Sequence, residues 1–227
     1  MSGQDVDFQE LKRVFNSSWV NTSRPLSVYM EIFEIPHRDI KKLLQNKKLL
    51  LVGGGNSKIQ RALNFARISC DVTNVDPYIN DKKSANTVIN CDFNETRFEN
   101  EFDEIWALYS LPLYSPDVAH AIEFYGRAAI ALKPGGTLRI GGHPKHVNGI
   151  LAAPVHFPRN NLMFELLDIF LETKIFDQEY TQMPTMIYNS KKTDIKLSSA
   201  SRHWEKWTAP QNPAIKQALN EHILKSL

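Results

Sequence analysis

KKLLLVGGGNSKIQRAL, residues 47–63, places three glycines between an apolar run and an amphipathic one. Residues 49–52 have the length and composition of a buried strand, and Ile59, Leu63 and Ala66 then recur at helical spacing. The glycines therefore lie where a strand gives way to a helix. An open α/β sheet binds nucleotide-like ligands at such a turn, so this turn is the first candidate binding site.

Strand and helix patterns alternate over the middle of the chain. Such alternation predicts an α/β fold with parallel strands joined by crossover helices. Another helical pattern and two β-rich runs follow, and the two runs predict an antiparallel hairpin at the edge of the sheet. The expected strands are residues 49–52, 70–76, 87–92, 104–110 and 137–142, the expected helices are 59–66, 118–132 and 160–173, and the hairpin is 174–181 with 185–190.

The chain divides into three parts by pattern. Residues 1–46 are predicted to be a helical extension that folds over the ligand as a lid and contributes Arg24 or Tyr29. Residues 47–192 are the expected core, and residues 193–227 are a tail with an amphipathic helix. That helix is expected to dock on its own domain rather than on a partner or a membrane. Its apolar residues fall four apart, at Ile215, Leu219, Ile223 and Leu227.

Composition sets limits on the class of protein. A chain of 227 residues with 42% hydrophobic and 23% charged residues is typical of a globular domain. The net charge of +2 is smaller than expected for a nucleic-acid-binding protein, although it does not exclude a local basic patch. No signal peptide or membrane-spanning run is seen, so we expect a soluble, cytoplasmic protein. Cys70 and Cys91 have no metal-ligand spacing, and we expect both to be reduced and structural.

Two ligand classes compete for the glycine turn: a dinucleotide, and S-adenosylmethionine. A dinucleotide fingerprint has a third small residue where this chain has Lys58, although a lysine beside a pyrophosphate is electrostatically favourable. Asp76 follows Gly53 by 23 positions, at the expected end of the second strand. A carboxylate there accepts hydrogen bonds from both ribose hydroxyls, which suits either cofactor. The alternative for Asp76 is a turn cap before Pro77.

Asp92 ends the expected third strand, in the sequence INCDFNE. From that position its carboxylate is placed to meet the exocyclic amine of an adenine, with Phe93 packing on the ring. The same residues also suit an ordinary turn.

Five segments together resemble the class I S-adenosylmethionine-dependent methyltransferases, over residues 47–189. The resemblance implies S-adenosylmethionine as cofactor and a Rossmann-like three-layer αβα sandwich. It also implies a mostly parallel sheet of about seven strands, in the order 3-2-1-4-5-7-6, with the last strand antiparallel. The segments are VGGGNS (52–57), NVDPY (74–78), INCDF (89–93), FDEIWALYSLPLY (102–114) and LKPGGTLRIGG (132–142). The implied cofactor-binding residues are Gly53, Gly54, Gly55, Ser57, Asp76, Asp92, Phe93 and Tyr109.

Two positions depart from the family pattern. The family usually has an acidic residue two places before the first glycine, near the amino group of the cofactor, and this chain has Leu51. A backbone carbonyl or a residue of the N-terminal helices then meets the ammonium, or binding is weaker. Ser57 replaces the third glycine of the family turn, which is a mild change.

The catalytic candidates are Tyr109, Ser110 and His143. Ser110-Leu111-Pro112-Leu113 resembles the signature of methyltransferases that act on amino groups, with Tyr109 or Tyr114 in place of the stacking aromatic. The alternative is that this strand end only packs on the first helix. His143 follows the fifth strand and is a candidate base, with Lys145 beside it to attract an anionic acceptor.

The sequence therefore predicts a methyltransferase whose acceptor is unidentified. A small molecule with an amine or hydroxyl is favoured; nucleic acid, protein and the oligomeric state stay open, and no membrane or metal is expected. One alternative is an NAD(P)-dependent dehydrogenase, because the first two segments also resemble the start of siroheme-pathway dehydrogenases. The other is a non-catalytic scaffold, with or without the cofactor. The reason for considering it is Leu51, which stands where the family usually has an acidic residue.

Overall fold

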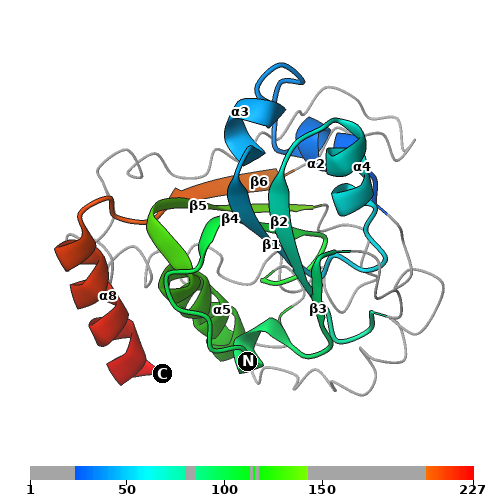
Figure 1. Ribbon diagram of the computed structural model, residues 1–227. Coiled ribbons are helices and arrows are strands. Elements are labelled where there is room, and N and C mark those ends of the chain that lie inside the picture. The colour runs from blue at the N-terminus through cyan, green and yellow to red at the C-terminus, as the bar shows by residue number, and fades with distance from the viewer. Residues whose placement is uncertain (1–23, 80–84, 113–114, 116–117, 143–202) are drawn as a thin grey trace, which may run out of the picture.

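Six strands form one sheet in the order β3-β2-β1-β4-β5-β6 (Figure 1). The computed structural model describes residues 24–79, 85–112, 115, 118–142 and 203–227. The first five strands pair in parallel, which confirms the predicted order 3-2-1-4-5, and β6 pairs antiparallel with β5. The strands are β1 (Lys47–Val52), β2 (Cys70–Val75), β3 (Thr87–Ile89), β4 (Phe102–Leu108), β5 (Leu132–Gly142) and β6 (His203–Thr208).

Helices cover both faces of the sheet, which makes the α/β sandwich three layers deep. Figure 1 shows α2, α3 and α4 on one side and α5 and α8 on the other. The helices are α2 (Leu26–Ile32), α3 (Ile40–Leu44), α4 (Ile59–Phe65), α5 (Val118–Ala131) and α8 (Pro213–Ser226), with a short 3-10 helix η1 (Phe93–Glu95) after β3.

The apolar side chains of β1 pack into two hydrophobic clusters, one on each face of the sheet. Leu49 and Leu51 pack into the cluster on the α2 side, whereas Leu50 and Val52 pack into the cluster on the α5 side. Successive side chains of a strand point to opposite faces, so a strand covered on both faces is apolar throughout. This is why the run has no polar alternation.

The described part of the expected N-terminal lid is a layer of the core. Tyr29 of α2 is 1% exposed and stacks on Trp106 of β4 with ring centroids 5.7 Å apart. Phe33 meets the same indole edge-on at 5.7 Å. Helix α2 therefore packs on the sheet, and Arg24, just before it, reaches the glycine turn.

The sheet extends beyond the expected core boundary at residue 192. Strand β6 lies in the expected tail and pairs with β5 in the register Leu138↔Trp207 and Gly141↔Trp204. It takes the place beside β5 that the resemblance gives to the last, antiparallel strand. The sequence HWEKWT does not alternate apolar and polar residues, which is why the pattern did not mark it. The predicted helix 160–173 and hairpin lie outside the described residues.

Helix α8 packs along α5, as the amphipathic pattern predicts (Figure 1). Leu219 and Ile223 are buried in the core cluster, while Ile215 and Leu227 are 41% and 47% exposed. A Cβ at Gly126 of α5 would lie 2.9 Å from Ile223 Cγ2, so the glycine permits the close approach.

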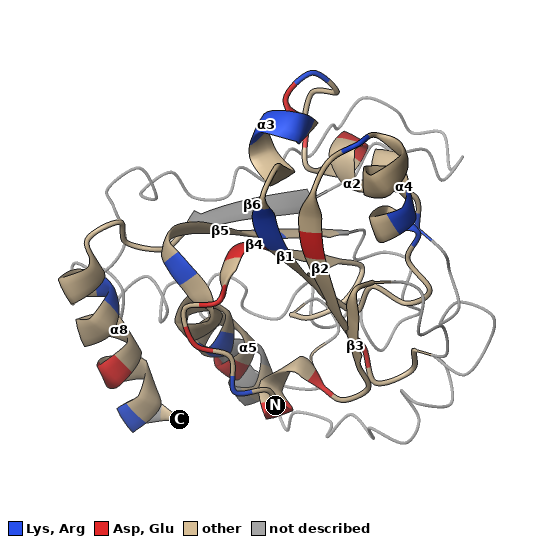
Figure 2. Cartoon of the chain, viewed as in Figure 1, with Lys and Arg blue, Asp and Glu red and all other residues tan. Residues whose placement is uncertain are grey.

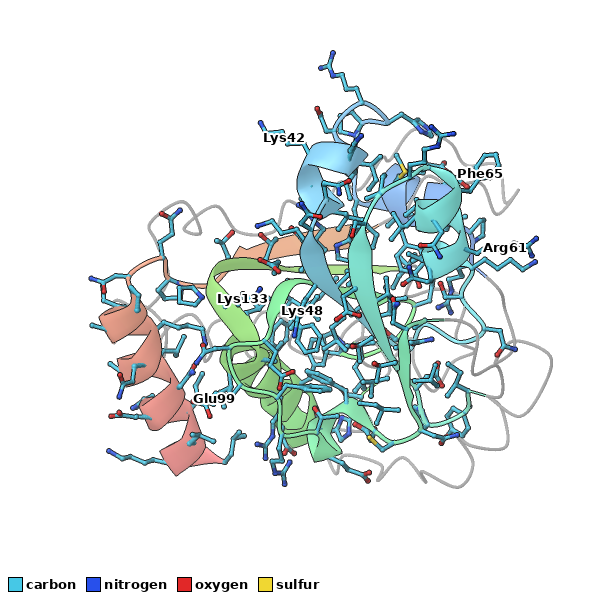
Figure 3. All side chains as sticks on the ribbon, viewed as in Figure 1. Lys42, Lys48, Arg61, Phe65, Glu99 and Lys133 are labelled. Atoms are coloured by element: carbon cyan, nitrogen blue, oxygen red, sulfur yellow. The ribbon has the colours of Figure 1, made fainter. Side chains whose placement is uncertain are left out.

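An ionic cluster ties together the amino-terminal edge of the sheet, away from the glycine turn. Asp103 at the start of β4 accepts bonds from Lys133 Nζ at 2.8 Å, Lys47 Nζ at 3.3 Å and the Lys48 N–H at 2.9 Å. Figure 2 shows the basic residues at the start of β1, and Figure 3 labels Lys48 and Lys133. Burial raises the pKa of Asp103, but the bonds from Lys133 and Lys48 outweigh it and lower the pKa. The opposite edge carries the candidate site.

Candidate functional site

The candidate site lies at the carboxyl-terminal edge of the parallel strands. The chain runs from β1 outward through β2 to β3, and then crosses back to β4 and β5 on the other side of β1. The strand order therefore reverses between β1 and β4, and open α/β sheets bind ligands at such a switch point. The segments that leave this edge begin at Gly53, Asp76, Asn90 and Tyr109.

Two glycines of the turn are required by the chain itself. Gly53 has φ +64°, and a Cβ there would lie 2.3 Å from Ser110 Cβ. A Cβ at Gly54 would lie 2.5 Å from Asn74 Oδ1. Gly55 also has a positive φ, +53°. The bare backbone therefore lets the ends of β2 and β4 close on the end of β1, before any ligand is considered.

Side chains of β2 and its following loop hold the turn in place. Asp76 Oδ2 accepts a hydrogen bond from the Gly55 N–H at 2.7 Å, and Asn74 Nδ2 donates to the Gly55 carbonyl at 2.9 Å. Ser57, 2% exposed, accepts from the Ile59 N–H at 3.1 Å, at the start of α4. Of the predicted residues, Gly55 and Asp76 are thus joined directly by a hydrogen bond.

Asp76 is 6% exposed in this arrangement. Its second oxygen accepts from the Tyr78 N–H at 2.8 Å. Burial raises the pKa of the carboxyl, and the bonds from Tyr78 and Gly55 and the charge of Arg24 offset this rise only in part. The carboxylate is therefore aimed at the glycine turn by backbone donors, and it keeps lone pairs for further donors.

Tyr109 and Ser110 directly follow β4, beside the end of β1. Ser110 Oγ donates to the Val52 carbonyl at 2.7 Å, and the residue is 8% exposed. The structure thus gives Ser110 a contact with the end of β1, and its part in catalysis stays a prediction. Tyr109 is half-buried and has φ +52°, a conformation that is costly for a bulky residue and frequent at functional sites.

Arg24 brings a positive charge to the glycine turn. Its Nη1 donates to the Gly53 carbonyl at 3.0 Å, and its guanidinium lies over the Tyr109 ring, 5.3 Å from the centroid. Leu51, where the family usually has an acidic residue, is fully buried in the core on the α2 side. The described part of the turn therefore has a cation beside the Gly53 carbonyl, while Leu51 brings no charge to it.

Asp92 and Phe93 lie at the start of η1. Asp92 Oδ1 accepts from the Asn94 N–H at 2.8 Å, the capping bond of that helix. Phe93 is 1% exposed and meets Phe124 edge-on, with centroids 5.4 Å apart. The Phe93 ring is therefore part of the hydrophobic core.

The structure adds one residue that sequence reasoning missed. His120, in the first turn of α5, places Nε2 at 3.5 Å from Asp92 Oδ2 and Nδ1 at 3.3 Å from Ser115 Oγ. Burial raises the pKa of Asp92, but the bonds from His120 and Asn94 outweigh it and lower the pKa. No spacing in the sequence signals this contact, because it depends on where α5 crosses the sheet.

The remaining predictions fall elsewhere. His143, Lys145 and Tyr114 lie outside the described residues. Within the described ranges there is no cluster of metal-ligating side chains. No helix in that part of the chain is long and apolar enough to cross a membrane.

The site as described is a row of hydrogen-bond acceptors with one cation. Asp76 and Asp92 follow neighbouring strands β2 and β3 and offer carboxylate oxygens, which suit hydroxyl and amine donors. Arg24 suits an anionic group near Gly53. A ligand with a polar heterocycle, a diol and a carboxylate or phosphate matches this set.

Comparisons with solved structures find distant likeness. A geranyl diphosphate C-methyltransferase from Streptomyces coelicolor is 15% identical, with a TM-score of 0.43, and the match covers 63% of this chain and 56% of that one. An S-adenosylmethionine-dependent methyltransferase from Clostridium acetobutylicum is 11% identical, with a TM-score of 0.43, covering 61% and 58%. The [4+2]-cyclase SpnF is 23% identical, with a TM-score of 0.39, covering 54% and 47%. The chain thus spans about half the length of these structures. No protein-family model and no curated protein matches the sequence.

Proposed function

We propose that this chain is an S-adenosylmethionine-dependent methyltransferase that acts on a small molecule bearing an amine or a hydroxyl. The observation that carries the proposal is the bond from the Gly55 N–H to Asp76 Oδ2 at 2.7 Å. It couples the acidic residue after β2 to the glycine turn after β1, at the switch point of the sheet. An adenosyl group needs this pair together, because the acid receives the ribose hydroxyls while the bare turn lets the nucleoside approach.

The hydrogen-bond acceptors and the cation of the site fit this cofactor. Asp76 would receive the ribose diol, and Asp92, one strand further out, would accept the exocyclic amine of the adenine. The Asp92 pKa is lowered by His120 and Asn94, so the carboxylate is ionised near neutral pH and acts only as an acceptor. Arg24, beside the Gly53 carbonyl, would pair with the carboxylate of the methionyl end.

The cofactor, when bound, supplies a methyl group that is already electrophilic, so the protein mainly has to bind and orient. Tyr109 and Ser110 follow β4, the strand that adjoins β1 at the switch point. The positive φ of Tyr109 turns the chain there, and its ring lies beneath Arg24. We assign Tyr109 to the boundary between cofactor and acceptor, and His143 keeps its predicted role as a base. The amine acceptor is drawn from the resemblance of residues 110–113 to the signature of methyltransferases that act on amino groups.

A thermal-shift series tests the proposal. S-adenosylmethionine and S-adenosylhomocysteine should each raise the melting temperature of the full chain, and NADH should not. Asp76→Asn should abolish the shift, because an amide offers one acceptor oxygen where the carboxylate offers two. Asp71→Asn is the matched control, since Asp71 is an exposed acid on the same strand, and it should keep the full shift.

The other outcomes separate the alternatives. Stabilisation by NADH alone would overturn the proposal in favour of a dehydrogenase. Stabilisation by none of the three compounds would favour a scaffold without the cofactor. Binding without methyl transfer to any acceptor, measured with cofactor carrying a labelled methyl group, would indicate a scaffold that retains it.

A further inference from the structure

Three side chains form a line from the start of α5 to the end of β3. Ser115 Oγ lies 3.3 Å from His120 Nδ1, and His120 Nε2 lies 3.5 Å from Asp92 Oδ2. Ser115 is 6% exposed, and the side chains of His120 and Asp92 are 21% and 24% exposed. The line is therefore largely shielded, while its Asp92 end still reaches solvent.

Two further bonds, both from Asn94, hold Asp92 and the backbone of His120. The Asn94 N–H donates to Asp92 Oδ1 at 2.8 Å, and Asn94 Nδ2 donates to the His120 carbonyl at 2.9 Å. Asn94 is 6% exposed. Helix η1 and the first turn of α5 are thus joined through one buried amide, which holds the backbone of His120 beside Asp92.

The line assigns the proton on the imidazole ring. An ionised carboxylate only accepts hydrogen bonds, so the ring nitrogen that faces Asp92 is the one that carries a proton. Nε2 therefore donates to Asp92, while Nδ1 shares a hydrogen bond with Ser115 Oγ. Asp92 then receives donors on both oxygens, from Asn94 and from His120, and both hold it ionised and in one orientation.

We propose that His120 is a positioning residue that makes this site specific for a base with an exocyclic amine. The inference rests on the proposed function. A carboxylate held ionised accepts a bond from the amine of adenine and repels the carbonyl oxygen of hypoxanthine. Released from His120, the carboxyl is held only by the Asn94 bond to Oδ1, so Oδ2 can shift, or can gain a proton and donate to that carbonyl. His120 thereby acts on base recognition through Asp92, without touching the ligand.

The test compares two ligands by calorimetry: S-adenosylhomocysteine, and S-inosylhomocysteine, in which a carbonyl replaces the amine. Wild-type protein should prefer the first by roughly a hundredfold. His120→Ala should reduce that ratio by about tenfold, as expected when a bond to a charged group is lost. His120→Gln, whose amide can still donate to Asp92, should keep the ratio within about threefold.

Two more variants guard against loss of the fold. Ser115→Ala leaves Asp92 and His120 in place and should lower the ratio by a smaller factor, about threefold, because the ring loses the hydrogen bond that orients it at Nδ1. His222→Ala, an exposed histidine of α8, should leave it unchanged. A merely structural clamp would weaken both ligands equally and leave the ratio at its wild-type value.

The outcomes distinguish this inference from the proposed function. If S-adenosylhomocysteine binds and the ratio is the same in wild type, His120→Ala and Ser115→Ala, the role of His120 is refuted while the proposed function stands. If S-adenosylhomocysteine does not bind wild-type protein, both are refuted.

Discussion

Gly53 and Ser110 lie so close that a Cβ on the glycine would come 2.3 Å from the Ser110 Cβ. The contact joins the ends of β1 and β4, and the Ser110 hydroxyl secures it with a 2.7 Å bond to the Val52 carbonyl. The Ser110 side chain thus packs against the end of β1 at the switch point of the sheet. The fold therefore requires glycine at position 53, whether or not a ligand binds at the turn.

Gly53→Ala should therefore destabilise the protein even without ligand. The φ of +64° disfavours any residue with a Cβ, and the contact with Ser110 adds steric strain. Together we expect a loss of about 3 kcal/mol in the free energy of unfolding, measured with urea. Ser110→Gly in the same chain should recover part of that loss, because it removes the atom that clashes. A change of under about 0.5 kcal/mol in Gly53→Ala would show that the turn is not closed in this way.

Arg24→Met should weaken ligands that carry a carboxylate and spare those that do not. The guanidinium lies at the Gly53 carbonyl, where the amino-acid end of the cofactor is proposed to lie. We expect S-adenosylhomocysteine to bind about tenfold more weakly, since a charge-assisted bond is lost. Binding of 5′-methylthioadenosine, which has no carboxylate, should be unchanged.

The control for this experiment is Arg38→Met, because the Arg38 side chain is 87% exposed and contacts only its neighbour Asp39 among the ion pairs described. Equal weakening of both ligands by Arg24→Met would place Arg24 outside the carboxylate site.

The pH dependence of stability should reveal the buried lysine of α8. Lys216 is 1% exposed, and its Nζ donates to Asn220 Oδ1 at 2.6 Å and to the Ile130 carbonyl at 3.4 Å. Burial lowers its pKa from 10.5 to about 8. Between those values the unfolded chain holds the proton and the folded chain does not, so stability rises with pH.

Relative to Lys216→Met, the wild-type protein should gain about 2 kcal/mol of unfolding free energy between pH 7 and pH 9.5. Chemical denaturation at both pH values measures this difference. Lys225→Met, an exposed lysine of the same helix, should follow the wild-type curve. If Lys216→Met runs parallel to wild type across this range, the lysine is not desolvated as described.

Much of the sheet was predictable because its strands are covered on both faces. Such strands are apolar throughout, as in β1, and glycine or proline marks where they begin and end. Strand β6 was not predictable in this way. Its pairing with β5 is set by where the chain returns to the sheet edge, and its sequence carries no alternation that signals a strand.

The site was predictable only where local sequence determines it. The glycine turn and Asp76 follow directly from the ends of β1 and β2, and the structure brings them together. Phe93 was expected at the ligand, but η1 turns its ring into the core against Phe124. The contacts of His120 with Asp92 and of Arg24 with Gly53 span 28 and 29 positions of the chain. Contacts between residues so far apart depend on helix placement, which no local pattern encodes.

Calorimetry with S-adenosylhomocysteine and NADH, on the same wild-type preparation, tests the central claim most directly. We predict that S-adenosylhomocysteine binds with one site per chain and that Asp76→Asn removes the binding while Asp71→Asn keeps it. NADH should give no binding heat. Binding of NADH in place of S-adenosylhomocysteine, or the same affinity in Asp76→Asn as in wild type, would contradict the account.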